Sequence, residues 1–92
     1  MVITILEAHV EEKNWSSFQT DFKTRTTDLP PQMIQTFLLQ DIADQTLWQI
    51  VSVWKSREAY DAFAPRFKAA MRERGFEFGE PSILTVNHYI EP

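Results

Sequence analysis

The pattern of apolar and polar residues along the chain predicts six secondary-structure elements in the order βαββαβ. Four segments are rich in β-branched and aromatic residues, as is typical of strands; they cover residues 2–10, 33–41, 46–54 and 82–90. Two segments repeat apolar residues at helical intervals, which places those residues on one face; they cover residues 15–27 and 56–75. We therefore expect four strands and two helices.

Local signals mark the ends of the two predicted helices. Asn14 and Ser56 can each cap a helix N-terminus through a side-chain oxygen. Gly75 follows a pair of arginines and suits a C-terminal stop. Pro65 lies well inside the second helix, where a proline removes a hydrogen bond and clashes with the preceding turn. We therefore expect a kink or a break near residues 61–64.

This order of elements predicts a single domain over residues 1–92. Among compact folds, βαββαβ most naturally closes as a ferredoxin-like α+β sandwich, in which two helices cover one face of a four-stranded antiparallel sheet. A chain of 92 residues, 43% of them hydrophobic, can bury one core but leaves little room for a second. If the first and last strands pair antiparallel, His9 is expected opposite about residue 83.

The two middle strands carry apolar residues on both faces. The opposed sets are Met33, Phe37 and Leu39 against Ile34 and Leu38, and Leu47, Val51 and Val53 against Trp48, Ile50 and Trp54. A sheet with helices on one face usually turns polar residues toward water on the other. An open apolar face would be an unusually large exposed patch for a small monomer. We therefore expect a symmetric homodimer that buries this face.

Composition and charge exclude several partners. The net charge of -4, with nine scattered basic residues, offers no positive surface to nucleic acid or an anionic membrane. The N-terminal segment has no basic region and no small-residue cleavage site. Its apolar stretch is too short to span a membrane, so we expect a cytoplasmic protein. Without cysteine or a helical histidine pair, and with His9 and His88 far apart along the sheet, we expect no metal site. Because no nucleotide-binding fingerprint is present, we expect no bound cofactor.

One segment carries a family resemblance. The third predicted strand ends at Trp54, and the sequence WKSREA over residues 54–59 is followed by Tyr60 and Phe63. Together with the element order and the two-sided sheet, this segment resembles the antibiotic-biosynthesis monooxygenase-like domains of the dimeric α+β barrel superfamily. The resemblance implies a homodimer whose two sheets pack into a barrel, with a small apolar cavity in each subunit between sheet and helices. Members include cofactor-independent oxygenases of electron-rich polycyclic phenols, haem-degrading enzymes, and small proteins without an assigned reaction.

The resemblance also implies roles for individual positions. In the phenol oxygenases a Trp, and a Tyr six positions later, contribute to the pocket, a spacing that Trp54 and Tyr60 match. Those enzymes carry an asparagine four positions before the Trp, where this chain has Ile50. The haem degraders bind iron through a histidine on the second helix, and residues 56–75 contain none. Haem degradation by that mechanism is therefore not expected.

Glu7, His9 and Tyr60 are the candidate catalytic residues. Glu7 shares a strand face with apolar residues, where a carboxylate is either paired with a Lys or Arg or acts as a base on a phenol proton. His9 is either a general base or the exposed end of the first strand. Tyr60 carries a polar tip that needs a partner when it is buried.

The large apolar residues near Trp54 either line a flat pocket for an aromatic ligand or fill the core between helix and sheet. They are Trp48, Ile50, Trp54, Phe63 and Phe67. The first functional hypothesis is a cofactor-independent monooxygenase that holds a small aromatic or quinol substrate beside Trp54 and Tyr60 and lets it react with dioxygen. The alternative is a non-catalytic homodimer that binds a small apolar metabolite. The sequence leaves both open.

Overall fold

The predicted order of strands and helices is confirmed in the computed structural model, which describes residues 1–86. The elements are β1 (Val2–His9), a short 3-10 helix η1 (Glu12–Asn14), α1 (Trp15–Arg25), β2 (Met33–Gln40), β3 (Leu47–Trp54), α2 (Arg57–Glu73) and β4 (Ser82–Thr85). The strands form one antiparallel sheet in the order β2-β3-β1-β4. The last predicted strand is observed as far as Thr85, and residues 87–90 of that prediction lie outside the described part.

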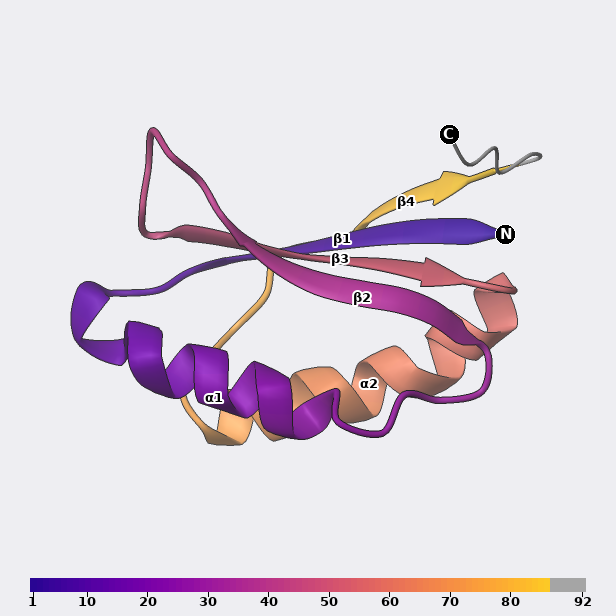
Figure 1. Ribbon diagram of the computed structural model, residues 1–92, viewed down its shortest axis with the longest axis horizontal. Helices are drawn as coiled ribbons and strands as arrows, with labels where there is room; N and C mark the ends of the chain where they lie inside the picture. Colours follow the sequence, from indigo (N-terminus) through magenta and orange to yellow (C-terminus); the bar gives the residue numbers. More distant parts are fainter. Residues whose placement is uncertain (87–92) are drawn as a thin grey trace.

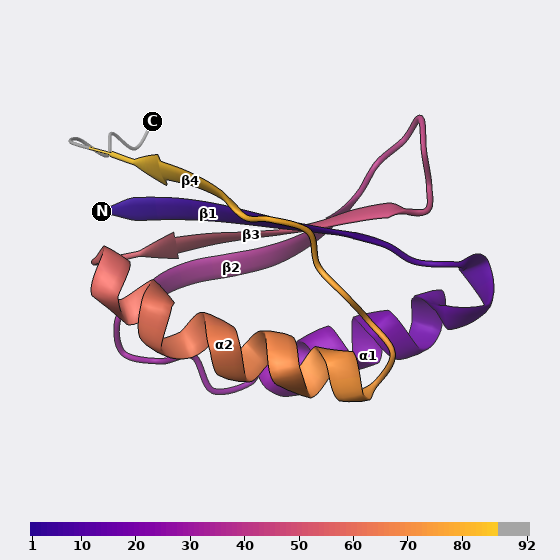
Figure 2. The ribbon, with the colours of Figure 1, turned by 180° about the vertical axis from the view of Figure 1, so that it is seen from behind.

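Both helices cover the same face of the sheet, so the molecule has two layers (Figure 1, Figure 2). We call the sheet face toward the helices the inner face and the opposite one the outer face. Side chains alternate between them, and the inner residues of the two central strands are Val2, Thr4, Leu6 and Ala8 of β1 and Trp48, Ile50, Ser52 and Trp54 of β3. All eight are buried. The predicted ferredoxin-like α+β sandwich is confirmed.

The signals at the helix ends are confirmed in part. The Ser56 hydroxyl caps α2 by accepting a hydrogen bond from the Ala59 N–H at 3.2 Å. Gly75 follows α2 with φ of 90°, a left-handed conformation that glycine adopts without strain. Asn14 occupies the N-cap position of α1 as predicted, but its side chain makes no capping hydrogen bond. The Asn14 carbonyl instead accepts a hydrogen bond from the Ser17 hydroxyl at 3.0 Å.

α2 continues unbroken through Pro65, so the expected break is wrong. The proline itself is exposed, and buried side chains lie on both sides of it; they are Tyr60, Ala64, Phe67 and Met71. Burying each large apolar side chain is worth about 1.5–3 kcal/mol, whereas an interior proline costs about 3 kcal/mol. Packing of both halves against the sheet therefore outweighs the lost backbone hydrogen bond.

A β-bulge in β2 changes the faces that simple alternation predicts. Met33 pairs with Trp54, and Gln35 pairs with Val53, so Ile34 has no partner of its own on β3. The bulge places Met33 in the core beside Trp54, whereas Phe37 and the other residues of its predicted face point outward. The prediction that Met33 shares a face with Phe37 is therefore wrong.

The pairing of β4 with β1 is also shifted from the expected register. Ile5 pairs with Ser82 and Thr4 with Ile83, so Thr4 rather than His9 lies opposite residue 83. The reason is that the chain joins β1 early on leaving α2, where the Glu7 carbonyl accepts a hydrogen bond from the Gly79 N–H at 2.9 Å. Within residues 1–86, no helix has the length and apolar character needed to cross a membrane.

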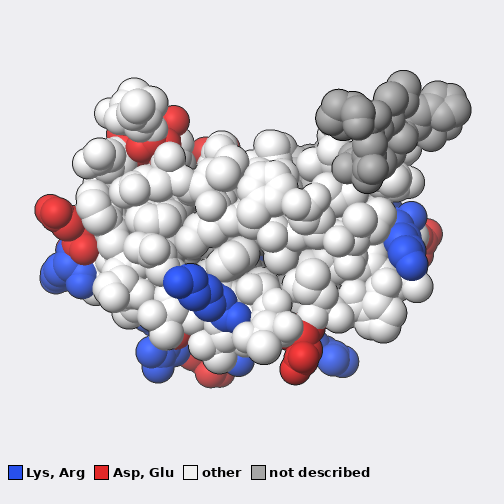
Figure 3. Space-filling view, in the orientation of Figure 1, with Lys and Arg blue, Asp and Glu red and all other residues white. Residues whose placement is uncertain are grey.

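The outer face, opposite the two helices (Figure 1), carries two apolar rows. One row is Phe37, Val51 and Ile5, and the next is Val53, Ile3 and Leu84. Phe37 is 37% exposed and Leu84 is 61% exposed. Charged side chains gather mainly around the helical layer and at the ends of the molecule, and uncharged ones cover the middle of the sheet layer (Figure 3). This face is the one that the sequence predicts to be buried in a dimer.

Candidate functional site

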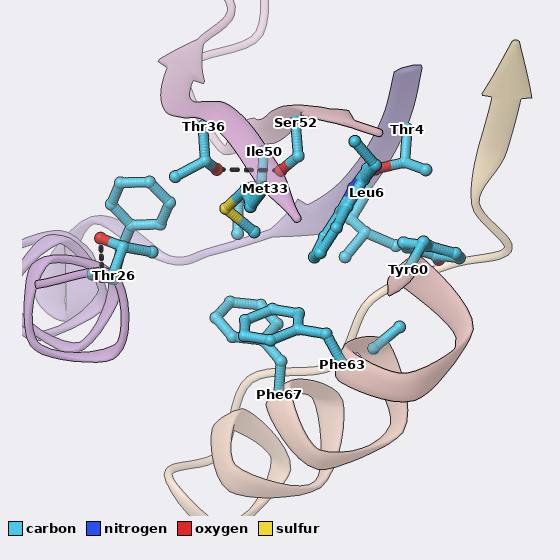
Figure 4. A pocket seen from close by; sticks show the side chains of 13 residues that line it. Thr4, Leu6, Thr26, Met33, Thr36, Ile50, Ser52, Tyr60, Phe63 and Phe67 are labelled. Carbon is cyan, nitrogen blue, oxygen red and sulfur yellow. Dashed lines mark hydrogen bonds between the residues drawn. The ribbon is translucent and has the colours of Figure 1, made fainter. Parts of the chain in front are cut away.

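A small enclosed cavity lies between the inner face and the two helices (Figure 4). Its volume is ≈ 20 Å³, about the space of one water molecule. It is lined by Thr4, Leu6, Phe22, Thr26, Met33, Thr36, Ile50, Ser52, Trp54, Tyr60, Phe63, Ala64 and Phe67. Strand residues form one wall, residues of α2 form the opposite wall, and Phe22 and Thr26 at the end of α1 close one side.

Aromatic rings from β3 and α2 form much of this lining. Trp54, at the end of β3, is 1% exposed, and its ring meets Tyr60 edge-on with centroids 5.7 Å apart. The ring centroid of Phe63 lies 5.3 Å from that of Trp54, and the Phe63 ring is stacked on the Phe67 ring with centroids 5.6 Å apart. These contacts arise because Ser56 starts α2 two residues after Trp54, which turns the first helical turns back over the strand end. The rings offer flat apolar surfaces to a ligand.

The strand wall of the cavity carries a row of three hydroxyl groups, which we call the hydroxyl row: Thr36, Ser52 and Thr4. The three residues are direct neighbours across β2, β3 and β1. The Thr36 and Ser52 hydroxyls lie 2.9 Å apart and share a hydrogen bond (Figure 4). The Trp54 indole N–H donates to the Thr4 hydroxyl at 3.1 Å. Thr4 and Ser52 are 1% and 5% exposed and Thr36 is half-buried, so the row is a polar strip in an apolar lining that is buried at two of its three residues.

Tyr60 forms the wall between the cavity and a groove on the molecular surface. Tyr60 is 5% exposed, and its hydroxyl has no hydrogen-bond partner within residues 1–86. Burial raises the pKa of the Tyr60 phenol, and the nearby charges of Arg57, Asp61 and Glu80 modify it less. The phenol therefore stays protonated at neutral pH and is a donor rather than a base.

Two surface grooves lie next to the cavity. One, of ≈ 490 Å³, runs between α2 and the segment before β4, and it shares Tyr60 and Ala64 with the cavity lining. The other, of ≈ 370 Å³, lies beside Pro30 and Pro31 and shares Phe63 with the cavity lining. Tyr60 and Ala64 therefore border both the cavity and the first groove, and Phe63 borders both the cavity and the second. Phe63 is only half-buried, so its ring is the less constrained of the two aromatic walls.

Five of the eight predicted site residues line the cavity: Ile50, Trp54, Tyr60, Phe63 and Phe67. Trp48 does not, since it lies at the far end of the inner face and packs edge-on against Trp15 and Phe18. Its buried indole N–H has no partner within residues 1–86. The cavity therefore lies around Trp54 and does not extend to Trp48.

Glu7 and His9 lie on the outer face, on the opposite side of the sheet from the cavity. Glu7 pairs with Gln49, and none of the ion pairs among residues 1–86 includes it. His9 is at the exposed end of β1, with its Nδ1 3.4 Å from the Thr46 hydroxyl and 3.8 Å from the Asp44 carboxylate. Strand alternation separates both side chains from Tyr60, so within one chain neither can act as a base on a ligand in the cavity.

The hydroxyl row was not predicted from the sequence. Thr4 and Ser52 occupy inner positions of β1 and β3, so the same alternation that assigned Trp54 to the core also assigns these two hydroxyls to it. A polar residue at a buried strand position is the signal that could have found them. Among residues 1–86, no group of three or more His, Cys, Asp or Glu side chains is arranged to hold a metal ion.

Comparison with known proteins identifies the fold. No protein-family model matches the sequence, and no curated protein matches it. A candidate antibiotic biosynthesis monooxygenase from Deinococcus radiodurans matches the structure with a TM-score of 0.78 and 10% identity, covering 100% of this chain and 98% of that one. A variant of SnoaB, a cofactor-independent oxygenase from Streptomyces nogalater, matches with a TM-score of 0.71 and 16% identity, covering 99% and 97%.

A third similar structure is a variant of MhuD with two manganese protoporphyrin IX molecules bound per active site. It matches with a TM-score of 0.70 and 19% identity, and all of both chains is covered. The fold is therefore that of antibiotic biosynthesis monooxygenase-like proteins, and the resemblance inferred from the sequence is confirmed at this level. The residues do not fit haem held by a histidine of α2, because α2 contains none.

The buried Tyr60 hydroxyl leads to a prediction about stability and pH. The pKa of Tyr60 is higher in the folded state than in the unfolded state, where it is about 10, because the folded state disfavours the phenolate. The contribution of Tyr60 to the free energy of unfolding is therefore fully present below about pH 10 and is lost as the pH rises above it. We expect Tyr60→Phe to remove this loss. Because the hydroxyl has no partner among the described residues, the variant should be as stable as the wild type or more stable at pH 7. Urea unfolding of both proteins at pH 7 and above pH 10 measures the difference.

A variant that is less stable than the wild type by more than about 1 kcal/mol at pH 7 would show that the hydroxyl makes a stabilising hydrogen bond. Other groups that titrate near pH 10 affect both proteins equally, so the comparison isolates Tyr60.

Proposed function

We propose that the chain binds a small aromatic quinol or phenol in the cavity and promotes its monooxygenation by dioxygen without a bound cofactor. The observation that carries this proposal is the aromatic-lined cavity between Trp54, Tyr60, Phe63 and Phe67, in a fold shared with a cofactor-independent oxygenase. Flat apolar walls suit a planar ring, and a few hydroxyl groups can orient it.

The chemistry requires an electron-rich substrate. A methylene or ring position RH₂ becomes RO while dioxygen gives one oxygen atom to the product and one to water, so RH₂ + O₂ yields RO + H₂O. The substrate supplies all four electrons, and its two hydrogens leave in the water. In this proposal the protein contributes binding, orientation and exclusion of bulk water. Tyr60, held protonated, donates a hydrogen bond to a substrate or oxygen-derived anion at the cavity wall.

Ligand entry requires the cavity to enlarge. Its ≈ 20 Å³ is far below the roughly 300–1,000 Å³ of typical small-molecule sites. Rotation of the half-buried Phe63 would join the cavity to the ≈ 370 Å³ groove beside Pro30. Met33 also lines the cavity, and its unbranched side chain adapts readily to a new shape. We propose that the substrate enters through this side.

Oxygen uptake tests the proposed reaction. The protein should consume dioxygen with at least one quinol of the dihydroxynaphthalene type faster than buffer does, with one product oxygen derived from ¹⁸O₂. Ala64→Leu, which fills the cavity wall, should lower the rate at least tenfold. Ala70→Leu adds the same volume to α2 at a residue that does not line the cavity, and it should retain the rate. Uptake equal to buffer across a panel of quinols, or full activity in Ala64→Leu, would contradict the proposal.

One observation favours a second candidate function, which is binding without catalysis. Among residues 1–86, the cavity lining contains no carboxylate and no histidine, and Tyr60 is its single titratable side chain. A non-catalytic homodimer that holds a small apolar metabolite needs no more than this lining. Saturable binding of a quinol without oxygen uptake would favour the second function over the first.

We also propose that two copies of the chain pair through the outer face. The two apolar rows on this face follow the alternation expected of a buried surface. Phe37 and Leu84 are the most exposed large residues in these rows. The loop between β2 and β3 rises on this side of the sheet and carries Ile42, which is 93% exposed (Figure 1). The Asp41 carboxylate accepts hydrogen bonds from the Ala43 and Asp44 N–H groups at 3.0 and 2.7 Å, which fixes the loop. A symmetric pair would bury both rows.

Light scattering with size exclusion tests this pairing. The wild type should have twice the mass of the 10.8 kDa chain at micromolar concentration. Phe37→Glu should shift it toward the monomer, because a charge in an apolar interface is strongly unfavourable. Thr20→Glu places the same charge on the exposed side of α1 and should leave the mass unchanged. A wild type that is monomeric at these concentrations would rule out the pairing.

A further inference from the structure

The hydroxyl row has more hydrogen-bond donors than its observed partners use. Each hydroxyl has one proton to donate and can accept two bonds. The Thr36–Ser52 hydrogen bond uses one of that pair's two protons. The Thr4 oxygen accepts from the Trp54 indole, and among the hydrogen bonds of residues 1–86 its own proton has no acceptor. Two hydroxyl protons on this wall are therefore left to donate.

The remaining donors lie where a ligand in the cavity would meet them. Figure 4 shows Thr36, Ser52 and Thr4 on the strand side and Phe63 and Phe67 on the helix side, across the cavity from them. Ile50, the next inner residue on β3, offers only an aliphatic surface. A planar ring between the two walls would contact mainly apolar groups, with polar contacts at this row and at the hydroxyls of Tyr60 and Thr26.

Two further hydroxyls line the cavity outside the row, those of Tyr60 and Thr26, and the Thr26 hydroxyl has no proton left to donate. The Thr26 hydroxyl donates to the Phe22 carbonyl at 2.7 Å. Its proton is therefore already used within α1. The contrast separates donors that are available to a ligand from a hydroxyl that only stabilises the end of a helix.

We infer that the hydroxyl row is the recognition element of the cavity and selects an aromatic ligand that bears an acceptor oxygen, such as a ring ketone, a quinone or a phenolic oxygen. The inference rests on the proposed function in assigning the same cavity to the ligand. The row donates to this oxygen, and the aromatic walls hold the ring. A hydrocarbon of the same shape leaves the hydroxyl protons unpaired in the core, which costs affinity.

Binding of a matched ligand pair tests this inference. 1-Indanone and indane differ by one carbonyl group and are small, and neither undergoes the proposed oxidation under the conditions of a binding titration. The double variant Thr36→Val/Ser52→Ala removes both members of one hydrogen bond and replaces them with apolar groups, so it is expected to fold. Its affinity for 1-indanone should fall about tenfold relative to the wild type, whereas its affinity for indane should stay within about twofold.

Two further variants complete the test. Thr26→Val removes the hydroxyl that is already bonded within α1 and should leave the preference for 1-indanone over indane unchanged. Thr36→Ser keeps a hydroxyl in the row and should also retain the preference. Thermal unfolding of each variant establishes that it is folded at the titration temperature.

The inference is overturned if the wild type binds neither ligand, if the double variant keeps the full preference, or if Thr26→Val loses it equally. These results are distinguishable from failure of the proposed reaction. Selective binding of 1-indanone without oxygen uptake from any quinol would overturn the reaction and leave the recognition element in place. Oxygen uptake that the double variant does not change, together with equal affinity for 1-indanone and indane, would overturn the recognition element and leave the proposed reaction in place.

Discussion

The burial of Trp54 under the first turns of α2 is the contact on which the rest of the structure depends. Its ring is 1% exposed and contacts Tyr60 and Phe63, while its indole N–H donates to Thr4 on the neighbouring strand. One side chain thus joins β3, β1 and α2. Because burying an aromatic side chain contributes several times what a single hydrogen bond does, this packing sets the distance between sheet and helix. The same distance sets the size of the cavity.

The two faces of the sheet differ in the side chains that they carry. The inner face supplies the cavity wall, with an apolar surface interrupted by the hydroxyl row. The outer face is apolar in its two central rows and carries Glu7 and His9 toward one end. Since alternation separates these faces by the thickness of the sheet, the proposed ligand site and the proposed pairing surface use different positions.

Much of the fold follows from local patterns. The alternation in β1 and β3 and the apolar spacing of α2 identify these elements and their buried faces, because one buried face imposes a fixed period on a strand or helix. The bulge at Ile34 and the unbroken course of α2 through Pro65 do not follow, since both depend on tertiary packing that local propensity does not contain. In the site, Trp54 and Tyr60 have the spacing that the family resemblance implies for pocket residues, and both line the cavity. Alternation places Glu7 and His9 on one strand face, but which face lies toward the cavity depends on how the helices pack, and that is not contained in the sequence of β1.

We expect the proposed ligand to bind beside Trp54, between the hydroxyl row and α2. The chain has three tryptophans, and Trp15 and Trp48 pack together at the other end of the core, with centroids 6.1 Å apart. The indole N–H groups of the three tryptophans give separate signals in a ¹H–¹⁵N spectrum. These signals can be followed while 1-indanone is added to the protein. If the ligand binds in the cavity, the Trp54 signal shifts on saturation while those of Trp15 and Trp48 stay in place. A stationary Trp54 signal, or shifts confined to Trp15 and Trp48, would contradict binding in the cavity.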